Sequence, residues 1–128
     1  MLTPEARARI AELLEEMQDL FQFENCVPLH VNSKGSNDDT PLIVALIRAD
    51  LQSVEDLLEA GADPNAIGED DFSALHWAAK RGADYVRVLL AHGAVPRGRN
   101  MFGETPQEIG RESNDPALMA LFAPWAEG

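Results

Sequence analysis

Apolar positions recur at helical spacing over the first part of the chain. Over residues 3–22 they fall three or four positions apart, which is typical of one buried helix face. Thr3 can cap the first turn of this helix, and Pro4 suits its first position. The pattern stops at Pro28 and in a polar, turn-rich stretch over 32–39. The first predicted element is therefore a helix followed by a polar loop.

The pattern then resumes as pairs of short helices. The first pair is predicted at 41–48 and 51–59, and the second at 74–81 and 84–91. A pair of this kind cannot bury its own apolar side, so each pair needs a neighbour. The chain is therefore predicted to be all-α, a stack of helix-turn-helix units.

Turn residues support these boundaries. Asp50 can cap the second helix of the first pair. Gly82 separates the helices of the second pair, whose turn is one residue shorter than in the first. The last helix is expected to begin at Asp115-Pro116 and to stop before Pro124, because proline interrupts a helix.

The helix pairs are copies of one sequence unit. Residues 40–65 read TPLIVALIRADLQSVEDLLEAGADPN, and a related copy containing SALHWAA and LLAHGA follows about 33 residues later. A third, more divergent copy opens at Thr105. This period and the T-P-L-H-x-A signature resemble the ankyrin repeat over residues 40–125. The resemblance implies an ankyrin-like repeat stack with an N-terminal capping helix.

The resemblance divides the chain into one domain with four parts. Residues 1–39 would form the capping helix and polar loop, followed by repeats at 40–66, 67–98 and 99–128, the last also serving as C-terminal cap. The apolar stripe of the first helix would also suit a membrane-surface or coiled-coil helix. Packing on its own domain is favoured, because a short array must cover the apolar side of its first unit.

Several positions depart from the family pattern. Ile43 stands where the family has histidine, and Ala49 stands at a usual glycine. In the last copy Gln107 and Glu108 replace the Leu-His pair, and Gly110 replaces an alanine. Polar residues in the final repeat suit an end that faces water. One further match, Asn32 to Asn65 across 33 residues, is too short to define another repeat.

The chain is strongly acidic. Its 128 residues carry a formal net charge of −12, and residues 37–66 alone hold seven acids and one base. Such a field repels nucleic acid and anionic membranes and speeds the approach of a basic protein. Solubility alone is the competing explanation for this acidity.

The cysteine content and the lack of visible targeting segments predict a cytoplasmic protein. Cys26 is the single cysteine, so no intrachain disulfide is expected. Neither a signal peptide nor an apolar run long enough to cross a membrane is visible. A protein that is a monomer when free is expected.

Neither catalysis nor cofactor binding is predicted. The three histidines show no metal-ligand spacing with acids or with the cysteine. The acidic pairs Asp38-Asp39 and Asp70-Asp71 lie in predicted loops, where nothing would bury them or separate their pKa values. No nucleophile motif or phosphate-binding glycine loop occurs. The resemblance implies that His76 hydrogen-bonds a loop to its helix and binds no ligand.

The resemblance also implies where a protein partner would bind, namely at the turns between repeats and the exposed side of each first helix. Apolar residues on such turns are the usual anchors of an interface, with charges around them. Alternatively, Phe72 and Phe102 fold back onto the neighbouring helix, and Trp77 belongs mainly to the core. The candidate residues are Asp39, Arg48, Glu69, Asp70, Phe72, Trp77, Lys80, Arg81, Met101, Phe102 and Glu104.

The leading functional hypothesis is a non-enzymatic binding protein that masks or sequesters one protein partner. Its sharper form is an acidic inhibitor of a basic toxin, as in immunity proteins that neutralise secreted nucleases. A scaffold or regulatory adaptor is the alternative, and a secreted bacterial effector also stays open. A partner with a basic surface is expected, with no nucleic acid, membrane or metal involved.

Overall fold

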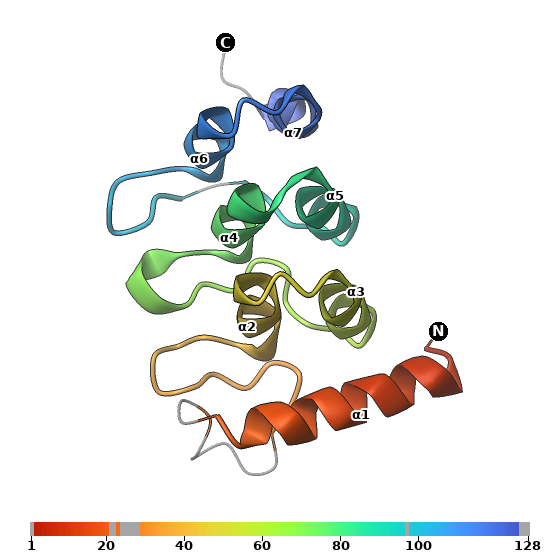
Figure 1. Cartoon of the computed structure of the whole chain (residues 1–128). Helices are drawn as coiled ribbons and strands as arrows, with labels where there is room; N and C mark the ends of the chain where they lie inside the picture. Colours follow the sequence, from red (N-terminus) through yellow and green to blue (C-terminus); the bar gives the residue numbers. More distant parts are fainter. Residues whose placement is uncertain (1, 21–22, 24–28, 97, 126–128) are drawn as a thin grey trace.

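The computed structural model describes residues 2–20, 23, 29–96 and 98–125, and these form a stack of helices (Figure 1). The predicted all-α fold is confirmed, because the only extended pairing within the described part is an isolated bridge between Ile67 and Ser73. The α-helices are α1 (Pro4–Gln18), α2 (Pro41–Ile47), α3 (Leu51–Glu59), α4 (Ala74–Arg81), α5 (Ala83–Ala91), α6 (Pro106–Glu112) and α7 (Pro116–Phe122).

The helices form two rows, and the loops project to one side (Figure 1). The inner row, next to the loops, holds α2, α4 and α6, and the outer row holds α3, α5 and α7. Helix α1 packs against α3 at the N-terminal end of the stack. We call the projecting loops the first finger (33–40), the second finger (66–73) and the third finger (98–105).

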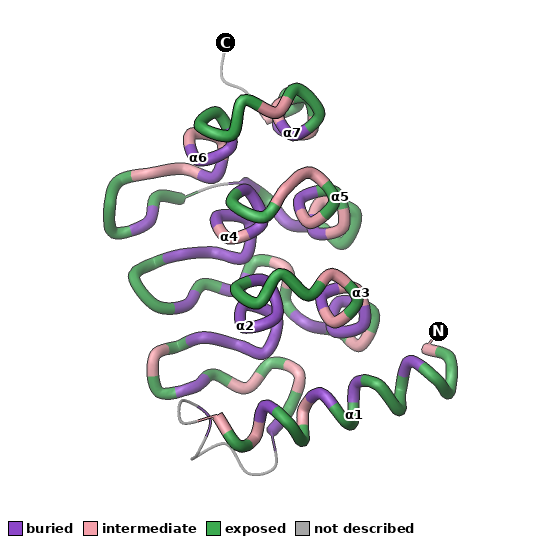
Figure 2. Tube along the Cα trace, in the orientation of Figure 1, coloured by how far each residue is buried: buried purple, intermediate pink, exposed green. Residues whose placement is uncertain are grey.

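Buried residues occur in the helices of both rows (Figure 2), and most of them belong to one hydrophobic core. Ala45 and Ala78 lie at matching places on α2 and α4, where a small side chain lets neighbouring helices approach closely. Larger residues fill the remaining space, and each buried leucine stabilises the fold by about 1.5–3 kcal/mol. The apolar positions predicted from the repeats are buried, except that Leu90 is half-buried.

Local capping explains where the helices begin. The side chains of Thr3, Asp50 and Asp115 accept hydrogen bonds from the backbone N–H groups of their own first turns, as predicted. Gly82 has a φ of +133° and forms the short turn between α4 and α5. Ala49, at a usual glycine position, has a φ of +56°.

Helix α1 is shorter than the predicted 3–22. It ends at Gln18, with Asp19 as C-cap. The Gln18 side chain donates to the carbonyl of Phe23 (3.2 Å) and accepts from the N–H of Leu29 (2.6 Å). The glutamine amide thus satisfies two backbone groups of the chain that follows α1. Residues 21 and 22 lie outside the described part.

An ion pair joins α1 to the outer row. Arg9 donates from Nε and Nη2 to the two carboxylate oxygens of Asp56 on α3, at 2.8 and 3.0 Å. The hydrogen bond from Arg9 lowers the pKa of the buried Asp56 carboxyl below its ordinary value. A bidentate pair fixes orientation as well as position, so it sets how α1 lies on α3.

Asn32 and Asn65 make equivalent contacts. Asn32 donates to the carbonyl of Gly61 (3.0 Å) and accepts from the N–H of Asp63 (2.8 Å). Asn65 donates to the carbonyl of Gly93 (3.4 Å) and accepts from the N–H of Val95 (2.9 Å). The short sequence match between the two asparagines therefore marks a structural repeat, and the repeat pattern begins before residue 40.

Gly110 lets α7 approach α6 closely. A Cβ atom at this position would lie 2.9 Å from Cδ2 of Leu118 and 3.3 Å from Cε2 of Phe122. Glycine stands in place of the family's alanine here, where Leu118 and Phe122 of α7 both pack closely on the α6 backbone.

Candidate protein-binding surface

The tip of each finger contains a residue with a left-handed backbone at the same position. Asp38, Asp71 and Gly103 occupy the same place in their fingers, and their φ angles are +68°, +62° and +77°. Asp70 also has a positive φ, +59°. Aspartate and glycine tolerate this left-handed region better than other residues. The acidic residues at the tips therefore serve the turn as well as carrying charge.

Asp39 joins the first finger to the second and is buried, with 4% of its surface exposed. Its carboxylate accepts from the backbone N–H of Glu69 (3.1 Å) and from the Asn37 side chain (3.1 Å). Burial raises the pKa of Asp39 above its ordinary value. The prediction that nothing would bury the Asp38-Asp39 pair is therefore wrong for Asp39, because a neighbouring finger covers it.

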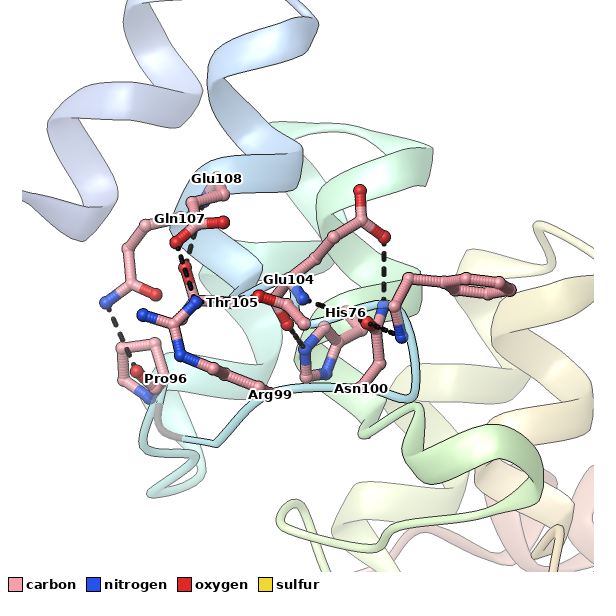
Figure 3. Close-up of polar contacts among 10 residues, drawn as sticks. His76, Pro96, Arg99, Asn100, Glu104, Thr105, Gln107 and Glu108 are labelled. Carbon is pink, nitrogen blue, oxygen red and sulfur yellow. Dashed lines mark hydrogen bonds and ion pairs between the residues drawn. The ribbon is translucent and has the colours of Figure 1, made fainter.

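His76 joins α4 to the third finger (Figure 3). Its Nδ1 atom accepts from the backbone N–H of Ser73 (3.1 Å), so Nε2 carries the proton and donates to the carbonyl of Glu104 (2.8 Å). Burial lowers the pKa of this imidazole below its ordinary value. The predicted role of His76, tying a loop to its helix, is confirmed. The backbone adds a second link, from the N–H of Met101 to the carbonyl of Asp70 (2.9 Å).

Phe72 lies at the centre of an aromatic cluster and is buried, with 7% of its surface exposed. Its ring centroid lies 5.0 Å from that of Trp77 and 6.2 Å from that of Phe102, which meets it edge-on. The Nζ atom of Lys80 lies 5.7 Å from the same centroid. The prediction of an exposed Phe72 is therefore wrong, because the ring folds back onto α4.

The position of Phe72 within its finger would have predicted that it is buried. Phe72 directly precedes the capping Ser73, as Asp39 precedes Thr40 and Glu104 precedes Thr105. Asp39 and Phe72 are both buried. Phe102 falls two positions earlier in its finger and is 67% exposed, beside Met101 at 58%.

Three predicted site residues are engaged in contacts within the stack. Arg81 donates to the carbonyls of Leu46 and Ile47 at the end of α2 (2.9 and 2.8 Å). Arg48 pairs with Glu16 of α1 (2.8 Å). The Glu104 carboxylate accepts from the Asn100 side chain (3.1 Å). These contacts order the repeats and the third finger.

Most acids of residues 37–66 also have structural partners. Asp39 accepts a hydrogen bond from the second finger, Asp50 caps α3, and Asp56 pairs with Arg9 of α1. Glu59 lies 3.5 Å from His92, and Asp63 accepts from the N–H of Asn65 (2.9 Å). Fewer acids of this segment are therefore available to a partner than their number in the sequence suggests.

An exposed set of residues remains on the second and third fingers and on α4. The acids of the second finger are all exposed, Lys80 is exposed, and Trp77 is half-buried. Apolar anchors and charges thus lie together on a scaffold held by cross-finger hydrogen bonds. We call this set the palm surface: Glu69, Asp70, Asp71, Trp77, Lys80, Met101 and Phe102.

The described residues offer little support for other kinds of site. Within the part of the chain that the structure describes, no group of three or more His, Cys, Asp or Glu side chains could hold a metal ion. In that same part, no helix has the length and apolar character needed to cross a membrane. Cys26 lies outside the described residues.

The comparisons with known proteins agree with the geometry of the stack. A family model described as ankyrin repeats, in three copies, matches residues 8–100. This match begins within α1, which agrees with the early repeat contact made by Asn32.

Three relatives illustrate the range of proteins that the chain is similar to. It is 44% identical over 71 residues to mouse 2-5A-dependent ribonuclease, covering 54% of this chain and 10% of the relative. It is 44% identical over 78 residues to Protein PhlB of Serratia liquefaciens, covering 59% of this chain and 34% of the relative. It is 37% identical over 84 residues to the nuclear factor NF-kappa-B p105 subunit of Gallus gallus, covering 66% of this chain and 8% of the relative. The chain thus spans about a third or less of each relative's length.

Proposed function

Because this chain belongs to the ankyrin-repeat family, whose repeats mediate interactions between proteins, we propose that its palm surface binds and sequesters a protein partner. The observation that carries the proposal is the exposure of Met101 and Phe102 at the tip of the third finger. Large apolar side chains on a rigid turn are typical anchors of protein interfaces.

Charge supports a partner with a basic surface. Glu69, Asp70 and Asp71 are exposed on the second finger, and the Asp70 carbonyl is bonded directly to the N–H of Met101. The net charge of the whole chain, −12, attracts cations over a longer range. Acids at the rim accelerate association with a basic protein, and apolar anchors slow dissociation.

The specific form of this proposal is an inhibitor that neutralises a basic toxin, acting in the cytoplasm and without catalysis of its own. The exposed Met101 and Phe102 lie beside the exposed acids of the second finger, and this combination suits the blocking of a basic site. The alternative is a scaffold or regulatory adaptor. An inhibitor binds one partner tightly and abolishes its activity, whereas an adaptor binds several partners and leaves their activities intact.

Affinity capture from the source cells tests the proposal. The wild-type chain and the Phe102→Ala variant serve as bait, each in about 50 mM and about 200 mM salt. We expect one predominant basic protein, captured best at low salt and lost from the Phe102→Ala bait. The captured protein is then purified and its activity is measured with and without the chain.

Arg87→Gln is the matched control, because Arg87 is exposed on α5 and pairs only with Asp84 among the described residues. Its capture should equal that of the wild type. Equal capture by the Phe102→Ala bait would place the partner elsewhere on the molecule. Several partners with undiminished activity would favour the adaptor.

A further inference from the structure

Three aromatic side chains cluster at the palm surface. The ring centroid of Phe72 lies 5.0 Å from that of Trp77 and 6.2 Å from that of Phe102. Two of the three rings already have a cation from this chain beside them. Lys80 Nζ lies 5.7 Å from the Phe72 centroid, and the guanidinium carbon of Arg81 lies 5.8 Å from the Trp77 centroid. Both distances are within the range of a cation–π contact.

Phe102 differs from the other two rings. It is 67% exposed, and among the described residues no basic side chain lies over it. Its contact with Phe72 is edge-on, at an interplanar angle of 78°. An edge-on contact covers at most one face of a ring, so a face of the exposed Phe102 is available to a partner. The most exposed ring of the cluster is thus the one without a cation.

Carboxylates lie next to this exposed ring. The second and third fingers project to the same side of the stack (Figure 1), and the N–H of Met101 donates to the carbonyl of Asp70 (2.9 Å). Asp70 and Asp71 are exposed, and within the described part of the chain their carboxylates have no hydrogen bond or ion pair. The palm surface carries three acids against one lysine, a net formal charge of −2. Arg81 and Glu104 at its edge cancel each other in charge.

Arginine suits this combination of ring and carboxylates better than lysine. Its planar guanidinium stacks on an aromatic face, and its five N–H donors can bind a carboxylate at the same time. A lysine ammonium is a compact, strongly hydrated charge and does not stack. Arg81 already combines the two contacts, because it lies over Trp77 while it donates to the carbonyls of Leu46 and Ile47 (2.9 and 2.8 Å).

We propose that the partner presents an arginine to the palm surface, with its guanidinium stacked on Phe102 and hydrogen-bonded to Asp70 and Asp71. The aliphatic part of this arginine packs on Met101. The inference rests on the proposed function and deepens it, because it names the side chain through which a basic partner is recognised. Shape as well as charge then selects the partner.

Three short peptides test the preference for arginine. Acetyl-Leu-Arg-Leu-amide is titrated into the isotope-labelled full chain at low salt while backbone amide signals are recorded. The same peptide with lysine, or with the uncharged citrulline, replaces it in parallel titrations. We expect the signals of Asp70, Asp71 and Phe102 to shift together, with millimolar affinity. The lysine peptide should bind about threefold more weakly, and the citrulline peptide at least about fivefold more weakly.

Variants locate the contact on the chain. Phe102→Leu keeps an apolar side chain but removes the ring, so it should weaken binding of the arginine peptide about threefold and abolish its advantage over lysine. Asp70→Asn should weaken binding about threefold. Glu12→Gln is the matched control, because it removes an exposed carboxylate from α1, at the N-terminal end of the stack (Figure 1), and should change nothing. Thermal unfolding of each variant checks that it is folded.

The outcomes separate this inference from the proposed function. Equal affinity for the arginine and lysine peptides, shifts spread over the acids of α1, or no shift at millimolar peptide would each overturn the arginine contact. If the Phe102→Ala bait loses the partner while the arginine and lysine peptides bind equally, only the arginine contact fails. If the arginine peptide is preferred while that bait captures the partner as the wild type does, the arginine contact stands and the proposed function fails.

Discussion

The second and third fingers both have a left-handed residue at the tip but differ in surface chemistry. Both carry a residue with a left-handed backbone at the tip, Asp71 in one and Gly103 in the other. The two positions before that residue are Glu69-Asp70 in the second finger and Met101-Phe102 in the third. All four residues are exposed. The two fingers therefore present different side chains to solvent at equivalent positions, acids in one and apolar residues in the other.

The two fingers also differ in how they are held. The second finger receives a side chain from the finger before it, since Asp39 accepts from the N–H of Glu69. The third finger is held by His76 from the helix before it. A buried carboxylate orders the acidic finger and a buried imidazole orders the apolar one. Substitutions at these two links should therefore affect the fingers separately.

The largest effect is expected from His76→Ala. The change removes a fully buried side chain and leaves the Ser73 N–H and the Glu104 carbonyl without their partner. The free energy of unfolding should fall by about 2–4 kcal/mol. Urea denaturation measures it, with the exposed His30→Ala as control. A loss below about 0.5 kcal/mol would show that the third finger does not depend on this link.

A smaller loss is expected from Gly68→Ala in the second finger. The added Cβ atom would overlap with Oδ1 of Asp39 and lie 3.1 Å from Cδ1 of Ile43. Overpacking of this kind costs about 1–3 kcal/mol. If Asp39 is the cause, combining the change with Asp39→Ala should cost less than the sum of the two single variants. Strict additivity in urea denaturation would contradict that cause.

Acidification should weaken the link to the third finger. Burial lowers the pKa of His76, so the unfolded chain binds a proton more readily than the folded one. Stability from this group is complete above the ordinary value of 6.5 and is lost as the pH falls below it. The raised pKa of Asp39 acts in the opposite direction, because folding then favours its protonated form in more acidic solution. Denaturation curves between pH 7.5 and 5.5 should show a decline that His76→Gln reduces.

The smallest effect on stability is expected from Asp71→Gly. Gly103 adopts the same conformation in the third finger, so the substitution fits the turn and removes one exposed charge. The free energy of unfolding should change by less than about 0.5 kcal/mol, whereas Asp71→Ala should cost about 1 kcal/mol because alanine resists a positive φ. A large loss on Asp71→Gly would mean that the carboxylate itself holds the finger.

The sequence was sufficient for features that depend on local signals. Capping residues such as Thr3, Asp50 and Asp115 act within one helical turn, so the starts of their helices could be predicted. The role of His76 followed from the family resemblance. Contacts between repeats were harder to predict, because the burial of Asp39 and Phe72 depends on a neighbouring finger or helix. Aligning the fingers position by position would have separated Phe72 from Phe102.

The distribution of charge on the surface was also hard to predict from the sequence. Counting acids predicted a strongly acidic first repeat, but Asp56 is paired with Arg9 from a helix 47 positions away in sequence. The exposed acids of the second finger stand out only when their side chains are placed. Composition therefore indicated the sign of the field but not the surface that presents it.

The most direct test of the account is the kinetics of binding to the captured partner. Surface plasmon resonance should compare Phe102→Ala with the double variant Asp70→Asn and Asp71→Asn, whose asparagines tolerate the same backbone. We expect Phe102→Ala to raise the dissociation rate at least about tenfold. The double variant should lower the association rate several-fold at low salt, with little effect on dissociation. Unchanged rates for both variants would contradict the assignment of the palm surface as the binding site.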